Sequence, residues 1–373
     1  MKRIMAICGW IGVILALDCA GPSAGIKISP PLSGKRVLFL GDSITQNGGY
    51  VSCIEYGLCK AYPDRPFDII GIGLSSETVS GLSEKTHPYP RPCVHERLMR
   101  ALKMVKPKTV VACYGMNDGI YHPPSADRLK AFQDGVLRLI REVQAAGADV
   151  ILLTPPPFDP VPISGKLLKD GADDYGYDHP YDRYNEVLEA YGRWIMDLRL
   201  PGVRSVDLNG PMTRYVESRR REDTTFCFSA DGVHPSPVGH LFMARQFLEA
   251  LGVPVQTNDL DHEWIRMLSD PLFTLVDKHR KVRSSGWLDY VGYTRGETVK
   301  TKSILETERE TARIRQEIDQ MRKQPVGIRG PKKQMPVLEK RLSLDRTASE
   351  RLQYDRNVPV SVPPVACCLS GIP

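Results

Sequence analysis

The sequence predicts an α/β fold in which a parallel sheet is covered by helices on both faces. Short apolar runs rich in β-branched residues alternate along the chain with longer segments whose apolar residues recur every three or four positions. A chain of 373 residues, 42% hydrophobic and 25% charged, can bury a substantial core. Because strands and helices that alternate in series need crossover connections, this order indicates parallel strands with helices on both sides.

The expected strands are buried runs at residues 36–40, 67–72, 109–114, 149–154 and 203–208. The expected helices lie near residues 50–61, 92–106, 125–146, 181–199 and 236–251. In the third helix Leu137, Ile140 and Val143 share one face, and Gly147 then marks its end. Reactive groups in such sheets gather where the strands end, so a candidate catalytic residue should directly follow a strand.

The start of the chain has the features of a secretory leader. Two basic residues precede an apolar run over residues 4–17, which is shorter than the roughly 20 residues that a membrane span needs. We expect a signal peptide over residues 1–24, no stable membrane span after its removal, and export to the periplasm or the extracellular space. Asp18 is a poor neighbour for a cleavage site, which leaves Ala20 and Ala24 as alternatives; a membrane-anchored first helix is the other interpretation.

Charge and cysteine spacing exclude several classes of site. The net charge of +6 is concentrated beyond residue 300, whereas residues 21–300 are neutral overall, so no basic groove for nucleic acid is expected. The cysteines of the body lack the paired spacing of a zinc site, and neither a Walker loop nor an H-E-x-x-H pattern occurs. We expect no metal and no cofactor. In an oxidising compartment two of Cys53, Cys59 and Cys93 could form a disulfide, and the sequence does not choose the pair.

The composition changes after residue 253. Residues 254–296 include an aromatic segment and are expected to pack back on the body. Residues 297–323 are strongly charged with few apolar positions, which predicts a solvated helix. Residues 324–373 are rich in Pro, Lys and Arg, which predicts a disordered basic tail of unknown partner.

Two segments carry residues suited to nucleophilic catalysis. Ser43 directly follows the first predicted strand, where it can open a helix with its N–H pointing toward a developing negative charge; an ordinary helix cap is the alternative. Asp231 and His234 lie three residues apart in the loop before the last predicted helix. At that spacing Asp231 can accept the ring N–H of His234, so that the other ring nitrogen can take a serine proton.

Two further candidates follow neighbouring strands. Gly73 comes after the second strand and leaves its N–H uncovered, and Asn117 comes after the third with an amide that can donate to an oxyanion. Glycine and asparagine also close ordinary turns, so each signal allows a purely structural explanation.

In order along the chain, the segments Gly41-Asp42-Ser43, Gly73, Gly115-Met116-Asn117-Asp118 and Asp231-Gly232-Val233-His234 resemble the four blocks of SGNH (GDSL-like) hydrolases. The resemblance covers roughly residues 34–252, within an expected esterase domain of residues 25–253. It implies a three-layer α/β/α sandwich with a central five-stranded parallel sheet, similar to flavodoxin. It also implies Ser43 as nucleophile, His234 as general base and Asp231 as its orienter, with an oxyanion hole made by Ser43, Gly73 and Asn117.

Three local features need separate interpretation. Gly71 stands two residues before the second block, where the family often has Asn, and this departure removes no catalytic group. The segment 21–25 matches G-x-S-x-G, yet it contains Pro and follows no core strand, so we interpret it as a linker. Gly71 and Gly73 also suggest a dinucleotide loop, but Ser76 stands where the third glycine should be.

The expected activity is hydrolysis of a carboxylic ester through an acyl-enzyme. The loop at 155–178 is rich in Pro, Asp and Tyr, which suits a sugar, so a small or polysaccharide ester such as an O-acetylated carbohydrate is the expected substrate. A simply solvated loop is the structural alternative. An O-acyltransferase with the same residues, or a non-catalytic carbohydrate-binding or envelope scaffold that uses the helix at 297–323 and the tail, remain the functional alternatives.

Overall fold

The computed structural model describes residues 31–255, 259–295, 297–298 and 303–323. The predicted signal peptide, the linker segment at 21–25 and the basic tail at 324–373 lie outside these residues. Within the described part, none of the helices combines the length and the apolar character that a membrane crossing requires.

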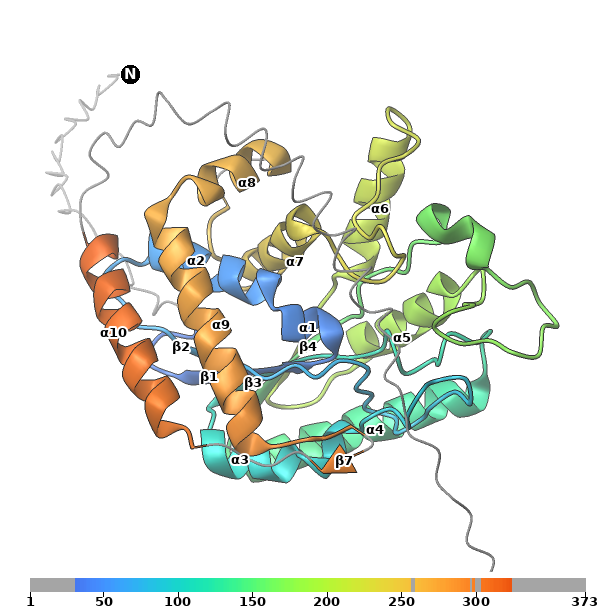
Figure 1. Cartoon of the computed structure of the whole chain (residues 1–373), viewed down its shortest axis with the longest axis horizontal. Coiled ribbons are helices and arrows are strands. Elements are labelled where there is room, and N and C mark those ends of the chain that lie inside the picture. Colours follow the sequence, from blue (N-terminus) through green and yellow to red (C-terminus); the bar gives the residue numbers. More distant parts are fainter. Residues whose placement is uncertain (1–30, 256–258, 296, 299–302, 324–373) are drawn as a thin grey trace, which may run out of the picture.

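A five-stranded parallel sheet forms the centre of the molecule (Figure 1). Its strands are β1 (Arg36–Gly41), β2 (Asp68–Gly71), β3 (Thr109–Cys113), β4 (Asp149–Leu153) and β5 (Val203–Val206). They lie in the order β2-β1-β3-β4-β5, and every neighbouring pair is parallel. The chain therefore leaves β1 toward one side and returns to β3 on the other, and the loops after these two strands diverge at the sheet edge. The predicted fold class is confirmed.

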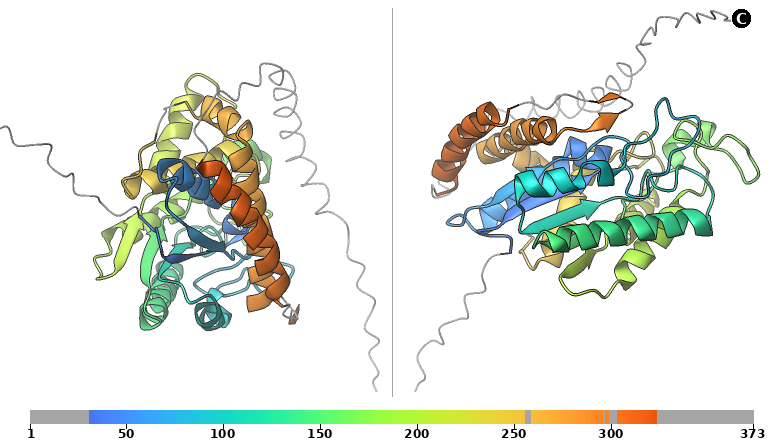
Figure 2. Two further views of the ribbon diagram at one scale, coloured as in Figure 1. Left: turned by 90° about the vertical axis from the view of Figure 1, so that its left-hand side faces the viewer. Right: turned by 90° about the horizontal axis from the view of Figure 1, so that it is seen from below.

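Helices cover both faces of this sheet (Figure 2). One face carries α2 (Gly49–Ala61) and α7 (Pro237–Ala250), which pack on each other and bring Phe247 against Phe39 of β1. The other face carries α3 (Leu98–Val105), α4 (Ala126–Ala145) and α5 (Asn185–Asp197). Ser125 caps α4 by accepting the N–H of Arg128, and the apolar face of this helix is buried. The amphipathic spacing in the sequence thus matches which side of each helix is covered.

The remaining described elements connect these layers or extend them. They are α1 (Ser43–Asn47), η1 (Val94–Glu96), η2 (Val161–Lys166), α6 (Asn209–Arg220), α8 (Leu260–Leu268), α9 (Pro271–Val291), the hairpin β6 (Thr294–Arg295) and β7 (Glu297–Thr298), and α10 (Leu305–Arg322). Helix α9 packs on α2 and on the edge strand β2, and α10 packs on α9.

The expectation of a solvated helix at 297–323 needs correction. The helix begins at Leu305, and its residues Thr311, Ile314 and Ile318 are buried. Arg315 also donates from Nη2 to Oε1 of Glu55, a fully buried carboxylate of α2, at 2.8 Å. A buried carboxylate needs a cationic partner, so a helix with few apolar residues still packs on the body.

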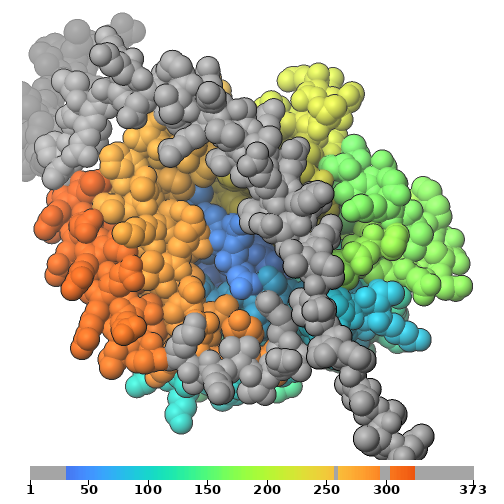
Figure 3. All heavy atoms as spheres, viewed as in Figure 1, coloured from blue at the N-terminus to red at the C-terminus, as the bar shows by residue number. Residues whose placement is uncertain are grey.

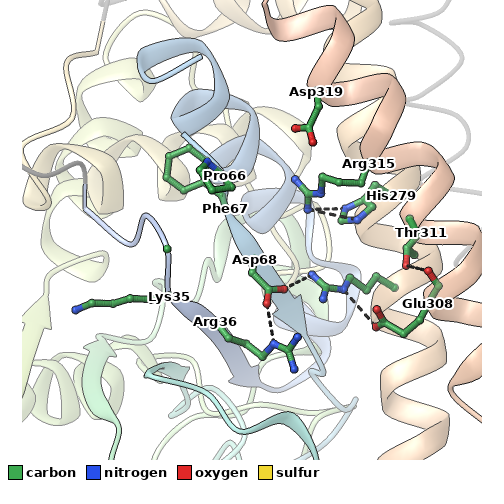
Figure 4. A pocket seen from close by; sticks show the side chains of 13 residues that line it. Lys35, Arg36, Pro66, Phe67, Asp68, His279, Glu308, Thr311, Arg315 and Asp319 are labelled. Atoms are coloured by element: carbon green, nitrogen blue, oxygen red, sulfur yellow. Dashed lines mark hydrogen bonds and ion pairs between the residues drawn. The ribbon is translucent and has the colours of Figure 1, made fainter. Parts of the chain in front are cut away.

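A cavity of about 420 Å³ marks the seam between these C-terminal helices and the sheet (Figure 4). It lies at the amino ends of β1 and β2, opposite the ends that carry the candidate catalytic residues. Asp68 pairs there with both Arg36 and Arg283, at 2.7 and 2.6 Å, and Arg315 reaches toward His279. These pairs satisfy the charges with one another and tie α9 and α10 to the sheet.

Candidate active site

Ser43 lies on a tight turn between the end of β1 and the short helix α1. Asp42 caps this helix, because its Oδ1 accepts the N–H of Ile44 at 2.9 Å. Gly41 has no room for a side chain, since a Cβ there would lie 2.2 Å from Oγ1 of Thr45 and 2.7 Å from the carbonyl oxygen of Cys113. The turn thus requires glycine before the cap and presents the following serine at the carboxyl edge of the sheet.

Ser43, His234 and Asp231 form a continuous chain of hydrogen bonds. Oγ of Ser43 lies 2.7 Å from Nε2 of His234, and Nδ1 of the same ring lies 2.7 Å from Oδ2 of Asp231. Burial raises the pKa of the Asp231 carboxyl, but the hydrogen bond and charge of His234 outweigh it and hold the pKa at about 2. An ionised Asp231 keeps the proton on Nδ1, which leaves Nε2 as the acceptor facing the serine.

The loop that carries Asp231 and His234 is fixed on both sides. Oδ1 of Asp231 accepts the main-chain N–H groups of Val233 and His234, at 3.0 and 2.8 Å. Gly232 has a φ of +79° and accepts the N–H of Asp159 at 2.8 Å, which joins the loop to the segment after β4. The imidazole therefore stands on a turn that is held by hydrogen bonds on both sides.

The predicted oxyanion donors follow the ends of β1, β2 and β3. Gly73 packs directly on α1, where a Cβ would lie 2.2 Å from the main-chain nitrogen of Gln46. Among the described residues, nothing accepts a hydrogen bond from the N–H of Ser43 or of Gly73. Asn117 is buried, with 4% of its surface exposed, and its Nδ2 donates to the carbonyl oxygen of Glu77 at 3.2 Å. One N–H of this amide remains for another acceptor.

Comparison with known proteins assigns the family. Residues 39–241 match the model of the GDSL-like lipase/acylhydrolase family. The chain belongs to this family. It is accordingly a carboxylic ester hydrolase, and the predicted SGNH resemblance is confirmed.

Individual relatives are more distant. The acetylxylan esterase of Geobacillus stearothermophilus is 23% identical over 251 residues, which cover 63% of this chain and 97% of that protein. A solved structure of a catalytic variant of the acetylxylan esterase from the same organism is 22% identical with a TM-score of 0.44, covering 61% of this chain and 98% of that one. A gut microbial diltiazem-metabolizing enzyme is 19% identical with a TM-score of 0.46; the match covers 60% of this chain and 48% of that enzyme.

Tyr121 is a residue of the site that the sequence analysis missed. Its hydroxyl donates to Oδ1 of Asn117 at 3.2 Å, which fixes the orientation of the amide, so that Nδ2 carries both the N–H that Glu77 accepts and the N–H that remains. Ile120 and Tyr121 both have left-handed backbones, with φ of 47° and 59°. For a β-branched residue such a backbone is strained, and strain of this kind gathers at functional sites. No feature of the sequence after Asn117 marks this turn.

Two loops of the esterase follow the carboxyl ends of β2 and β4, the sheet edge on which Ser43 lies. In the loop after β4, Tyr177 is exposed and lies 5.4 Å, between ring centroids, from His87 in the loop after β2. Asp170 of the same loop pairs with Arg183, which neutralises part of the acidic charge of the loop. In the space-filling view, the blue segment near residue 50 is visible between the orange C-terminal helices and the green loops (Figure 3).

The disulfide considered among Cys53, Cys59 and Cys93 does not form, and all three are thiols. Cys53 and Cys59 lie six residues apart on α2, a separation of about 9 Å along the axis, which exceeds the Cα distance that a disulfide can bridge. In the described part of the esterase, no group of three or more His, Cys, Asp or Glu side chains is arranged to hold a metal ion.

Asp42 gives the esterase a testable pH dependence of stability. Burial raises the pKa of this carboxyl from 3.8 to about 7, an effect that the Ile44 N–H and the charge of His234 offset only in part. Because the pKa is higher in the folded state, the contribution of Asp42 is fully present below pH 3.8 and is lost as the pH rises through about 7.

We expect Asp42→Asn to remove this dependence, since an amide oxygen can still accept the Ile44 N–H. Urea unfolding across this pH window should show the free energy of unfolding of the wild type falling relative to the variant by up to about 1.4 kcal/mol per pH unit. The exposed residue Asp149 supplies the control, and Asp149→Asn should follow the wild type. Parallel curves for the wild type and Asp42→Asn would contradict the assignment.

Proposed function

We propose that the protein is an exported serine esterase that removes an acyl group, foremost acetyl, from a carbohydrate. The observation that carries the mechanism is the hydrogen-bonded chain from Oγ of Ser43 through both ring nitrogens of His234 to Asp231. Family membership supports ester hydrolysis, and the leader-like start of the sequence supports export.

The geometry supports a two-step reaction. Nε2 of His234 takes the proton of Ser43 as Oγ attacks the ester carbonyl carbon, and the resulting oxyanion accepts the N–H groups of Ser43 and Gly73 and the amide of Asn117. His234 then gives its proton to the departing alcohol oxygen, which leaves an acyl group on Ser43. Water, deprotonated by His234, attacks this ester, and the carboxylic acid leaves as the serine regains its proton.

A carbohydrate ester is the proposed substrate class. The loops after β2 and β4 carry His87, whose ring contacts those of Tyr89 and Tyr177, and these rings offer flat apolar faces with polar edges, as sugar rings require. The acetylxylan esterase named above is a relative that aligns over 97% of its own length. Both observations favour an acetylated sugar over a long-chain lipid.

Acetate release from acetylated xylo-oligosaccharides, measured beside hydrolysis of p-nitrophenyl acetate, tests the proposal. We expect the wild type to cleave both and Ser43→Ala to cleave neither. Cleavage of p-nitrophenyl acetate alone would refute the carbohydrate assignment, whereas transfer of acetyl to an added sugar with little free acetate would identify an acyltransferase. If the wild type cleaves neither substrate, the proposed acetylated carbohydrate is refuted as the substrate class. Export predicts that the mature protein begins after Ala20 or Ala24, and an intact leader on the purified protein would contradict it.

A further inference from the structure

Arg97 is a buried residue outside the four family blocks that contacts the backbone of the second block. It directly precedes the first residue of α3, and 1% of its surface is exposed. Its Nη2 donates to the carbonyl oxygen of Ile72 at 2.7 Å. That oxygen belongs to the same peptide unit as the N–H of Gly73. In a planar trans peptide the C=O and N–H point in opposite directions, so an arginine that holds the oxygen directs the Gly73 N–H away from itself.

The same guanidinium also holds Glu77. Nε donates to Oε1 at 2.6 Å and Nη2 donates to Oε2 at 2.7 Å, while the Tyr114 hydroxyl donates to Oε2 at 2.6 Å. The main-chain oxygen of Glu77 in turn accepts Nδ2 of Asn117 at 3.2 Å. One side chain thus fixes both ends of the segment 72–77, and each end governs one oxyanion donor.

We propose that Arg97 is the positioning residue of the oxyanion hole, which orients Gly73 through Ile72 and Asn117 through Glu77. The inference rests on the proposed function of these two donors. Arginine is required because its planar fork reaches a main-chain oxygen and a carboxylate together, which the ammonium of lysine cannot do in the same geometry. Oxyanion donors stabilise a transition state only when they are held in place before the charge develops.

Arg97→Lys tests the proposal because it keeps the positive charge beside Glu77 and removes the fork. Arg283→Lys is the matched control: Arg283 is 6% exposed, pairs with Asp68 at 2.6 Å and donates to the carbonyl oxygen of Ile69 at 3.1 Å. It therefore makes the same kinds of contact with the same strand, β2, but at the end that lies away from Ser43.

We expect Arg97→Lys to lower kcat for p-nitrophenyl acetate by about 10- to 100-fold with KM changed less than about twofold, since the lost stabilisation belongs to the transition state. Binding of phenylboronic acid, which forms a tetrahedral adduct on the nucleophilic serine, should weaken by the same factor. Arg283→Lys should retain both kcat and boronate affinity. Thermal unfolding of both variants establishes that each is folded at the assay temperature.

A folded Arg97→Lys variant with wild-type kcat and boronate affinity would overturn the proposal, as would an equal loss in Arg283→Lys. If Arg97→Lys does not fold, Glu77→Gln replaces it, because it weakens the hold of the fork and keeps the main-chain contacts; unchanged kcat in that variant would likewise overturn the proposal. Ser43→Ala distinguishes a failure of the proposed function from a failure of the role proposed for Arg97. Full activity in Ser43→Ala refutes the proposed function, whereas an inactive Ser43→Ala beside an unimpaired Arg97→Lys refutes the role of Arg97 alone.

Discussion

Ser43→Ala should lower kcat for ester hydrolysis by about four to six orders of magnitude, to the level that binding and the oxyanion hole supply without a nucleophile. Within the described residues the Ser43 hydroxyl hydrogen-bonds to His234 alone, so the variant should fold with nearly unchanged stability. Steady-state hydrolysis of p-nitrophenyl acetate and urea unfolding measure the two quantities on the same preparation.

The control for this prediction is the double variant Ser43→Ala/His234→Ala. The two residues act on the same proton, so removing the second after the first should cost almost nothing more. If the kcat losses of the two single variants multiply in the double variant, the serine and the imidazole act independently. That result would contradict the proposed proton transfer between them. Retained activity in Ser43→Ala would place the nucleophile elsewhere.

Asn117→Ala should lower kcat by about 100- to 1000-fold, which corresponds to roughly 3 kcal/mol of transition-state stabilisation. The alanine removes the amide N–H that remains after Nδ2 has donated to Glu77, while Ser43 and His234 keep their contact. The effect should fall on kcat more than on KM, because the negative charge develops only after the substrate has bound.

Asn209→Ala is the matched control for this variant. Asn209 is also 4% exposed and donates from Nδ2 to a main-chain oxygen, that of Pro155, at 3.2 Å, but it begins α6 after the outer strand β5. Both variants leave a carbonyl oxygen without its donor and should lose comparable stability. Similar kcat values for the two folded variants would show that Asn117 acts through stability rather than on the oxyanion.

The sheet could be predicted because its strands are buried on both faces. Both β1 and β3 contain fully buried neighbours, namely Leu38, Leu40, Val110 and Val111. A strand that is buried on both faces appears in the sequence as a continuous apolar run. The packing of the C-terminal helices was harder to predict from the sequence. Helix α9 runs to Val291, and α10 packs on it through a narrow apolar stripe, while Arg315 of α10 pairs with Glu55 of α2. Such a contact depends on Glu55, 260 residues away from Arg315 in the sequence, which no local pattern reveals.

The residues of the candidate site that could be predicted are those whose type and position in a short local motif indicate their chemistry. The structure brings Ser43, His234 and Asp231 into one hydrogen-bonded chain and places Gly73 against α1. Tyr121 and Arg97 could not be found in this way. The first depends on a left-handed turn and the second on a buried guanidinium that reaches a main-chain oxygen 25 residues earlier in the chain. Both follow from tertiary packing rather than from a local motif.

Covalent labelling of the nucleophile tests the central claim most directly. Diethyl p-nitrophenyl phosphate reacts with a serine whose hydroxyl proton is taken by a neighbouring base, and the label is located by peptide mass spectrometry. We predict one diethylphosphoryl group on the peptide that contains Ser43 in the wild type, none in Ser43→Ala and much slower labelling in His234→Ala. A wild-type protein that hydrolyses esters while Ser43 stays unlabelled, or that carries the label on another residue, would contradict the account.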